Sequence, residues 1–268
     1  KALGCSEIQK YHMNEGHSTL LTLELYQEYA KSRKPEAEVR RRCVFTTHTP
    51  IPAGHDQFGK DAVLQMMGAY VPPELYDTLF VDGLLNLTRL GLTFSKYFNG
   101  VAKKHGEISR QMFPGYHIES ITNGIHAGFW ASAPFRKLFD KYLPGWIADS
   151  YNLRYVLSIP GQELWAAHMQ AKDALMTHVN TMFGAEMDRE VFTIGFARRA
   201  TAYKRAEMLF SDVEWLKKIA QKSKGVQIIY AGSAHPHDGE GKQLIRRIIE
   251  TMKSVRDIIK VCYIENYN

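Results

Sequence analysis

The chain has few cysteines and no long apolar run. Its 268 residues include three cysteines, Cys5, Cys43 and Cys262, and no two of them have the C-x-x-C spacing of a redox or zinc motif. They lie in or near apolar, strand-like stretches, so we expect buried free thiols in a reducing compartment such as the cytoplasm. No segment approaches the roughly 18 consecutive apolar residues that a membrane helix requires, and no signal-peptide pattern opens the sequence.

Several common ligand motifs are also missing. No G-x-G-x-x-G or P-loop Gly-Lys motif follows an apolar run, which argues against an NAD-dependent enzyme or a P-loop ATPase. Basic and acidic residues, 34 and 28 with a net charge of +6, are dispersed along the chain, which suits anionic small ligands at least as well as nucleic acid. The spacing of His48 and His55 fits no standard metal-ligand pattern, so we expect these side chains to anchor a loop and predict no metal site.

The most informative stretch that is present covers residues 191–210. An apolar, β-rich run, 191–196, ends at a basic loop, and an amphipathic helix is predicted from near Tyr203. Ligands gather at the carboxyl ends of parallel strands, and the positive end of a following helix favours anions. Arg198, Arg199 and Lys204 therefore form a candidate phosphate site. A solvated basic helix start explains the same cluster equally well.

From residue 191 onward, strands alternate with helices. The pattern predicts strands at 191–196, 226–231 and 258–264 with a helix at 239–253, and hence a parallel sheet with right-handed crossovers. Three strands are fewer than the five or six of a Rossmann-like domain, and the chain begins at Lys1 instead of Met. We therefore expect a piece of a longer protein, with a domain boundary near residue 185.

The first half carries a polar cluster at a predicted helix entrance. Residues 11–30 are interpreted as a short loop followed by a helix, with Asn14, Glu15 and His17 at the junction. These side chains can point into a cleft, or Asn14 can simply cap the helix. Both interpretations stay open on the sequence alone.

Other elements follow from local composition. Residues 43–47 have strand composition, and residues 162–182 form a long predicted helix before Gly184. Residues 84–96 and 101–113 are interpreted as two helices joined near Asn99. An Asn123-Gly124 turn comes before His126, and a histidine beside a turn is more often a structural hydrogen-bonding group than a ligand.

Seven ordered segments resemble one family, the α-glucan phosphorylases, in particular the shorter bacterial and archaeal type. They are YHMNEGHSTL, FTTHTPIPAGHDQF, FNGVAKKHGEISRQMF, ITNGIHAGFW, GFARRATAYKRAEMLF, AGSAHP with GEGKQLI, and YIENY. The resemblance implies an α/β fold of the GT-B type, in which two Rossmann-like domains face each other across a cleft, both incomplete in this chain. Residues 1–185 would be the C-terminal part of the glucan-binding domain, and residues 186–268 the first part of the cofactor and phosphate domain.

The resemblance also implies a reaction. Phosphorylases use inorganic phosphate to release the terminal α-1,4-linked glucose of a glucan as glucose 1-phosphate, reversibly. Their cofactor is pyridoxal 5′-phosphate, whose phosphate group exchanges a proton with the substrate phosphate. We therefore expect a cytoplasmic enzyme that forms a homodimer or a larger assembly. We expect no nucleic acid or membrane partners.

Site residues carry over position by position. The resemblance implies that Arg199 and Lys204 bind the substrate and cofactor phosphates, that Arg198 is a neighbouring basic residue, and that Tyr267 lines the cofactor pocket. The residues that it places on the sugar side of the cleft are Glu15, His17, Asn99, Asn123 and His126.

The sequence departs from the family pattern at three places. The lysine that holds pyridoxal phosphate lies downstream of the family's ENY segment, beyond Asn268. Lys96 stands where a histidine contacts the sugar, and Ser233 replaces a lysine of the phosphate site. Loss of one charge-assisted contact costs about 1.5 to 3 kcal/mol. We therefore expect this chain to be inactive alone, and activity in a longer parent to be weakened.

Two alternatives remain. A nucleotide-sugar glycosyltransferase of the same architecture also uses an arginine and a lysine after a strand of its second domain, although the HTPIPAGHD and TNGIH segments argue against it. A non-catalytic glucan-binding homologue would account for Lys96 and Ser233.

Overall fold

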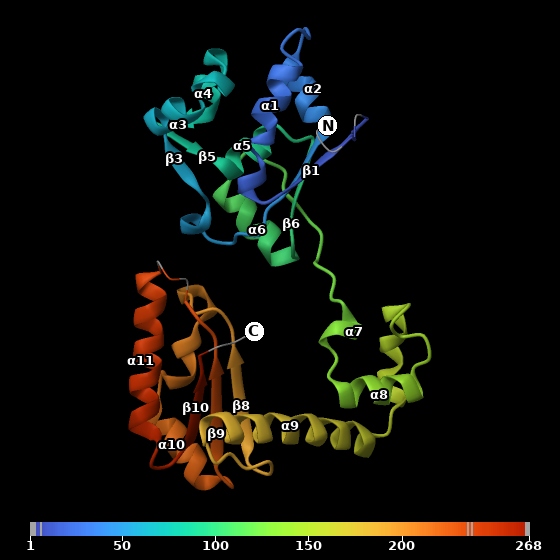
Figure 1. Cartoon of the computed structure of the whole chain (residues 1–268), viewed down its shortest axis with the longest axis vertical. Helices are drawn as coiled ribbons and strands as arrows, with labels where there is room; N and C mark the ends of the chain where they lie inside the picture. Colours follow the sequence, from blue (N-terminus) through green and yellow to red (C-terminus); the bar gives the residue numbers. More distant parts are fainter. Residues whose placement is uncertain (1–3, 6, 235, 237, 266–268) are drawn as a thin grey trace. The chain divides into compact units, whose positions relative to one another are not determined.

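The computed structural model describes residues 4–5, 7–234, 236 and 238–265. The chain divides into two compact units, residues 1–125 and 126–268, and each is described by itself (Figure 1). The predicted domain boundary near residue 185 concerns the whole protein and stays a prediction. Tyr267, the predicted cofactor-pocket residue, lies outside the described residues.

The strands form one parallel sheet in each unit, and the first unit has a small antiparallel sheet as well. The strands are β1 (Tyr11–Asn14), β2 (Cys43–Thr46), β3 (Gln57–Gly59), β4 (Phe80–Val81), β5 (Leu84–Asn86), β6 (Tyr97–Gly100), β7 (Glu119–Ser120), β8 (Phe192–Ala197), β9 (Val226–Ala231) and β10 (Lys260–Ile264).

Helices connect these strands. The α-helices are α1 (Leu21–Glu28), α2 (Pro35–Arg42), α3 (Lys60–Met67), α4 (Tyr76–Leu79), α5 (Leu87–Thr93), α6 (Lys103–Met112), α7 (Ala127–Trp130), α8 (Ala133–Tyr142), α9 (Gly161–Phe183), α10 (Val213–Lys222) and α11 (Gly239–Val255). The 3-10 helices are η1 (Gly16–Ser18), η2 (Pro52–Gly54), η3 (Gly68–Tyr70), η4 (Pro73–Leu75), η5 (Ser150–Ser158), η6 (Ala202–Lys204) and η7 (Ala206–Phe210). Among the described residues, no helix combines the length and the apolar composition that a bilayer crossing needs.

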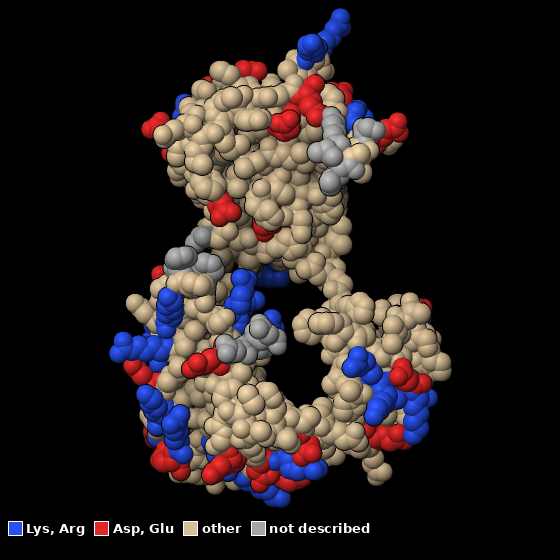
Figure 2. Space-filling model, in the orientation of Figure 1, with Lys and Arg blue, Asp and Glu red and all other residues tan. Residues whose placement is uncertain are grey.

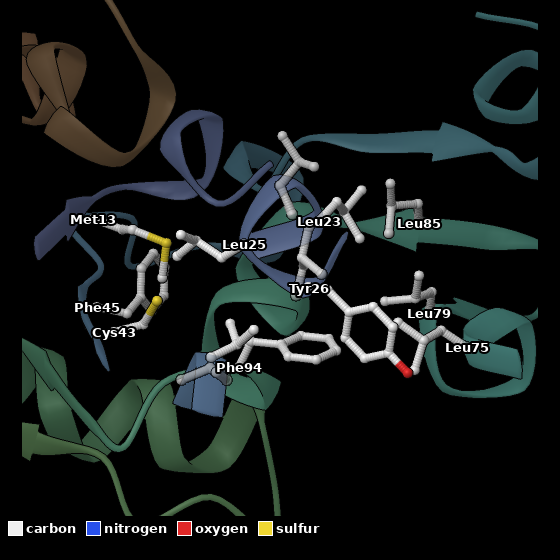
Figure 3. Close-up of a cluster of buried hydrophobic side chains, with 14 of the residues drawn as sticks. Met13, Leu23, Leu25, Tyr26, Cys43, Phe45, Leu75, Leu79, Leu85 and Phe94 are labelled. Atoms are coloured by element: carbon white, nitrogen blue, oxygen red, sulfur yellow. The ribbon is translucent and has the colours of Figure 1, made fainter. Parts of the chain in front are cut away.

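In the first unit, the parallel sheet has the order β1-β2-β6-β7. Its core lies against α1, where Leu25 from the helix faces Met13 and Phe45 from the sheet, and Leu23 lies in the same buried cluster (Figure 3). Each of these four side chains is at most 1% exposed. Burying such a side chain stabilises the fold by about 1.5 to 3 kcal/mol, so this core fixes the position of the neighbouring strand ends.

In the second unit, the parallel sheet has the order β10-β9-β8, as the strand-helix alternation predicts. Side chains of β9 alternate between two faces. Ile228 and Tyr230 pack in one cluster with α10 and α11, whereas Ile229 packs with Met176 and Val179 of α9. The sheet is therefore covered by helices from both sides, in the manner of a Rossmann-like α/β layer.

Several predicted elements differ from the structure. Residues 11–14 form strand β1 instead of a loop, because backbone pairing with β2 outweighs weak local propensity. Residues 84–96 contain strand β5 before α5, and Asn99 lies on strand β6 instead of between two helices. The helix predicted near Tyr203 is two short 3-10 segments, since Arg205 adopts a left-handed conformation with φ 54°.

The cysteine prediction is confirmed for two of the three residues. All three thiols are free, and Cys43 and Cys262 are buried, but Cys5 is exposed. Burial raises the pKa of the Cys43 thiol to about 11, which keeps it protonated and unreactive at neutral pH.

His55 anchors the loop after β2, as predicted. Its Nδ1 lies 2.7 Å from Thr88 Oγ1, and its ring meets the Phe113 ring edge-on at 5.2 Å. Burial lowers the pKa of this imidazole; Glu15 opposes the effect by raising the pKa. His55 is therefore held neutral inside the first unit.

This burial predicts an acid-sensitive fold. An unfolded histidine has a pKa near about 6.5, so below that pH the unfolded chain takes up a proton that folded His55 resists. The unfolding free energy of the first unit should fall with pH below about 6.5, by at most about 1.4 kcal/mol per pH unit for one proton. Urea unfolding followed by hydrogen exchange of first-unit peptides at pH 7.5 and 5.5 measures this fall.

The matched control replaces an exposed histidine of the same unit. His55→Gln should flatten the pH dependence, and His117→Gln, at an exposed position, should leave it unchanged. An equal pH dependence in the wild type and in His55→Gln would rule out His55 as the source.

Candidate functional site

In the first unit, polar residues gather at the carboxyl ends of three neighbouring parallel strands. Asn14 at the end of β1 pairs in register with Thr46 at the end of β2, and Thr46 pairs with Asn99 on β6. Thr46 and Asn99 are 7% and 5% exposed. This sheet edge is where α/β proteins place ligands, so it is the first candidate site.

A hydrogen-bond chain crosses this edge. His12 Nε2 lies 2.8 Å from Thr46 Oγ1, and Thr46 Oγ1 donates to Asn99 Oδ1 at 3.1 Å. The Asn99 amide nitrogen donates to the Gly100 carbonyl at 3.0 Å. The Thr46 hydroxyl gives its single proton to Asn99, so it accepts from His12. The orientation of the Asn99 side chain is therefore fixed from both ends.

Glu15 follows β1 in an unusual backbone conformation, with φ 74° and ψ 166°. Its carboxylate accepts hydrogen bonds from Gly16 N at 3.0 Å and Thr47 Oγ1 at 3.4 Å. It also accepts from His48 N at 2.7 Å and Thr49 Oγ1 at 2.9 Å. Glu15, rather than Asn14, thus caps the first short helix.

His48 is a further candidate site residue, although the sequence predicts for it only a loop-anchoring role. Its Nε2 lies 2.5 Å from Asn14 Oδ1, which confirms the anchoring, but its side chain is exposed beside Glu15 at the end of β2. Its Nδ1 has no hydrogen-bond partner within the described part of the chain. The His-Thr-Pro sequence directly after a buried strand is the signal that could have found it.

The structure brings some predicted sugar-side residues together and not others. His17, on η1, is exposed two residues after Glu15. Asn123 is also exposed, and its backbone N–H donates to the carbonyl of Val101 just past β6. Lys96 lies before β6, where its N–H donates to Cys43 at the start of β2, so it sits at the opposite end of the strands from Asn99.

In the second unit, the basic loop leaves the carboxyl end of β8. The N–H of Arg198 donates to the Ala231 carbonyl at 3.1 Å, and the N–H of Ala200 donates to the Ser233 carbonyl at 3.1 Å. A Cβ on Gly232 would lie 2.0 Å from the Arg198 carbonyl oxygen, and one on Gly241 would lie 2.6 Å from that of Ala200. Two glycines therefore let the loop pack directly against neighbouring backbone.

The basic loop carries the three predicted cations. Arg198 and Arg199 are exposed and Lys204 is half-buried, with its Nζ 4.7 Å from the centre of the Tyr203 ring. No carboxylate among the described residues pairs with any of the three. Elsewhere on the visible face of the second unit, basic and acidic side chains are interspersed (Figure 2), so the unpaired loop cations form the candidate anion site.

His126 has a structural role in the second unit. Its Nδ1 accepts a hydrogen bond from Phe129 N at 2.9 Å and so caps α7. This contact confirms the structural interpretation of a histidine beside a turn, although the exposed ring leaves Nε2 open to solvent. Across the described ranges, no group of three or more His, Cys, Asp or Glu residues could hold a metal ion.

No family model matches the chain, but named relatives match almost all of it. It is 33% identical to a maltodextrin phosphorylase of Thermococcus litoralis, over 96% of the chain and 35% of that protein. It is 31% identical to a glycogen phosphorylase of Aquifex aeolicus, over 96% of the chain and 43% of that protein. Over almost all of its length, the chain is a homologue of α-glucan phosphorylases.

This phosphorylase homologue is also 29% identical to a glycogen phosphorylase of Mycobacterium tuberculosis, over 96% of the chain and 35% of that protein. It spans between about a third and a half of the length of these relatives. The match covers both units of the chain, so the strand-edge cluster and the basic loop belong to one homologous stretch. The family resemblance stated from the sequence is confirmed.

Proposed function

We propose that the protein containing this chain is an α-glucan phosphorylase that converts a terminal α-1,4-linked glucose unit and inorganic phosphate into glucose 1-phosphate, reversibly. The observation that carries the proposal is a set of three cations at the end of β8 that pair with no described carboxylate, Arg198, Arg199 and Lys204. The named relatives of the chain are phosphorylases. We further propose the GT-B arrangement, a cytoplasmic location and a homodimer or larger assembly.

The basic loop suits a reaction between phosphate groups. Two phosphates close enough to share a proton repel each other, and fixed cations offset that repulsion better in a water-poor cleft than in bulk water. The Arg199 guanidinium offers paired donors to phosphate oxygens, and Lys204, packed on Tyr203, offers a compact positive charge. Both side chains would bind and orient the anions.

Pyridoxal 5′-phosphate is the proposed cofactor. Its phosphate group is an anion, and the loop supplies cations that no described carboxylate neutralises, so the donor set fits. Arg198 and Lys204 would hold this group, with Tyr267 as a further proposed contact. When bound, the cofactor supplies a phosphate that exchanges a proton with the substrate phosphate.

On the sugar side, we propose that His17, Asn99, Asn123 and His126 contact the glucosyl units. Asn99 is the best supported, because its amide is fixed by Thr46 and by the Gly100 carbonyl. Lys96 stays in the proposal as a departure from the family pattern, although its position at the start of β6 argues for a lesser role.

The test measures glucose 1-phosphate release from maltoheptaose and inorganic phosphate, with pyridoxal 5′-phosphate present. Because the chain spans only part of its relatives, the assay uses the longest protein that contains these 268 residues. Arg199→Ala and Lys204→Ala should each lower kcat/KM by about 100- to 1,000-fold, the usual effect of losing one preorganised charge-stabilising donor.

The control is Arg246→Ala on α11, where the exposed Arg246 pairs with Glu250 at 2.9 Å; it should stay within about twofold of the wild type. Glucosyl transfer from a nucleotide diphosphate sugar, without need for pyridoxal phosphate, would instead select a nucleotide-sugar glycosyltransferase. Maltoheptaose binding without turnover would select a glucan-binding homologue.

A further inference from the structure

The carboxylate of Glu15 is already fully used by the protein. A carboxylate offers about four acceptor positions, and four donors occupy those of Glu15: Gly16 N, Thr47 Oγ1, His48 N and Thr49 Oγ1. A sugar hydroxyl would have to displace one of these donors. Direct contact with a ligand therefore does not explain the position of this side chain.

The backbone of Glu15 gives a second, independent observation. Its angles, φ 74° and ψ 166°, lie in a region that side-chain-bearing residues rarely adopt and that persists only where surrounding contacts enforce it. The Glu15 N–H donates to the Thr46 carbonyl at 2.8 Å. The Glu15 carboxylate accepts hydrogen bonds from the segment that follows Thr46. The strained backbone conformation of Glu15 therefore occurs together with the hydrogen bonds that its carboxylate accepts from residues 47–49.

What Glu15 holds is the segment bearing His48. The shortest of the three hydrogen bonds that Glu15 accepts from this segment comes from the His48 backbone N–H, at 2.7 Å. Asn14 Oδ1 accepts from Nε2 of the His48 imidazole. The Thr47 N–H donates to the Asn99 carbonyl at 3.1 Å, which joins the segment to β6. With Nε2 engaged, His48 Nδ1 is the ring atom left to meet a ligand at the sheet edge.

We propose that Glu15 is a positioning residue: its carboxylate fixes residues 47–49 so that His48 presents Nδ1 at the carboxyl edge of β2, beside Asn99. Only the identity of the ligand as a glucan rests on the proposed function. The positioning itself is a property of the ligand-free chain and can be tested there.

The test follows His48 by nuclear magnetic resonance in the 268-residue chain labelled with ¹⁵N-histidine and ¹⁵N-phenylalanine. In Glu15→Gln, the new NH₂ group faces hydrogen-bond donors and cannot accept from them. Exchange of the His48 amide with solvent should therefore speed up at least about tenfold. The imidazole ¹⁵N shifts should move from the Nε2–H form toward those of a free histidine. Amides of Phe45 in the core of β2 should change less than twofold, which separates positioning from general loss of stability.

Two further variants keep the test decisive. Glu15→Gly removes the carboxylate, but glycine adopts the observed backbone angles without strain. Its unfolding equilibrium constant should therefore be about tenfold smaller than that of Glu15→Ala. The His48 amide of Glu15→Gly should exchange as fast as in Glu15→Gln. The matched control is Glu24→Gln, an exposed acid on α1, which should leave the His48 signals unchanged. His48 amide exchange within twofold of the wild type in folded Glu15→Gln and Glu15→Gly would overturn the proposal.

Maltoheptaose then separates this proposal from the proposed function. A positioning role predicts that Glu15→Gly and His48→Ala weaken binding by factors that do not multiply in the double variant, because both act through His48. Factors that multiply would mean that Glu15 contacts the sugar itself, against the proposal. If the chain binds no maltoheptaose, glucan binding by this sheet edge fails, and the exchange data still decide the role of Glu15.

Discussion

Replacing Gly232 by alanine should destabilise the second unit by more than about 3 kcal/mol. Gly232 has φ 151°, and an added Cβ would lie 2.0 Å from the carbonyl oxygen of Arg198, a distance that no side-chain rotation can relieve. Tyr263 also donates its hydroxyl proton to the Gly232 carbonyl at 2.8 Å, so this turn is held on a second side. The basic loop must move or the sheet must open.

Tryptophan fluorescence measures this effect, because all four tryptophans lie in residues 126–268. The control is Gly195→Ala on the same sheet, since a Cβ on Gly195 meets no atom within 4 Å; its unfolding midpoint in urea should change little. A Gly232→Ala protein that unfolds at the wild-type urea concentration would show that the Arg198 turn is looser than the structure has it.

Trp146→Ala is the second change with a large expected effect, about 3 to 5 kcal/mol. Trp146 is 1% exposed and fills the small core that α8 and α9 share with Leu143 and Ile159. Its ring meets Phe139 edge-on at 5.2 Å, and its indole N–H donates to Asp140 at 2.9 Å. Truncation leaves a cavity and a carboxylate without its donor.

Far-UV circular dichroism in urea is the appropriate measurement, because the substitution itself removes a fluorophore. Trp165→Ala supplies the control, since Trp165 is 64% exposed and its loss should cost less than about 1 kcal/mol. Equal midpoints for Trp146→Ala and Trp165→Ala would mean that the small core contributes nothing to the cooperative fold.

The sequence predicts the second sheet well because its strands are long and apolar. The β9 strand is confirmed at the predicted residues 226–231, between Gly225 and Gly232. The helix predicted from Tyr203 is wrong because Arg205 turns left-handed, and nothing in the local composition indicates that conformation. Pattern alone cannot distinguish a continuous helix from two short 3-10 segments of similar length.

The first sheet is harder to predict because its strands are short. In β1 only Met13 of four residues is buried, so the alternation that identifies a strand is hardly visible. The pairing of β1 and β6 with β2 comes from contacts far apart in the sequence, and such contacts override weak local preference. Asn99 was predicted as a site residue from the family resemblance and not from its strand, and that role stays a prediction.

The side-chain network of the site shows the same limit. The family resemblance places Glu15 and Asn99 on the sugar side but gives His48 no role there. The hydrogen bonds that Glu15 accepts from residues 47–49 accompany the unusual backbone angles of Glu15. Sequence indicates which residue types are present, and the fold determines which atoms of each remain available to a ligand.

The short 3-10 segments after β8 determine how an anion would be held there. The η6 segment has only three residues, and the first α-helix after β8 begins at Val213. The loop therefore lacks the aligned peptide dipoles of a long helix terminus. The attraction would therefore come from side-chain charges, two of which, on Arg198 and Arg199, are exposed to solvent and counterions. Ionic strength should consequently govern how tightly this loop retains a phosphate.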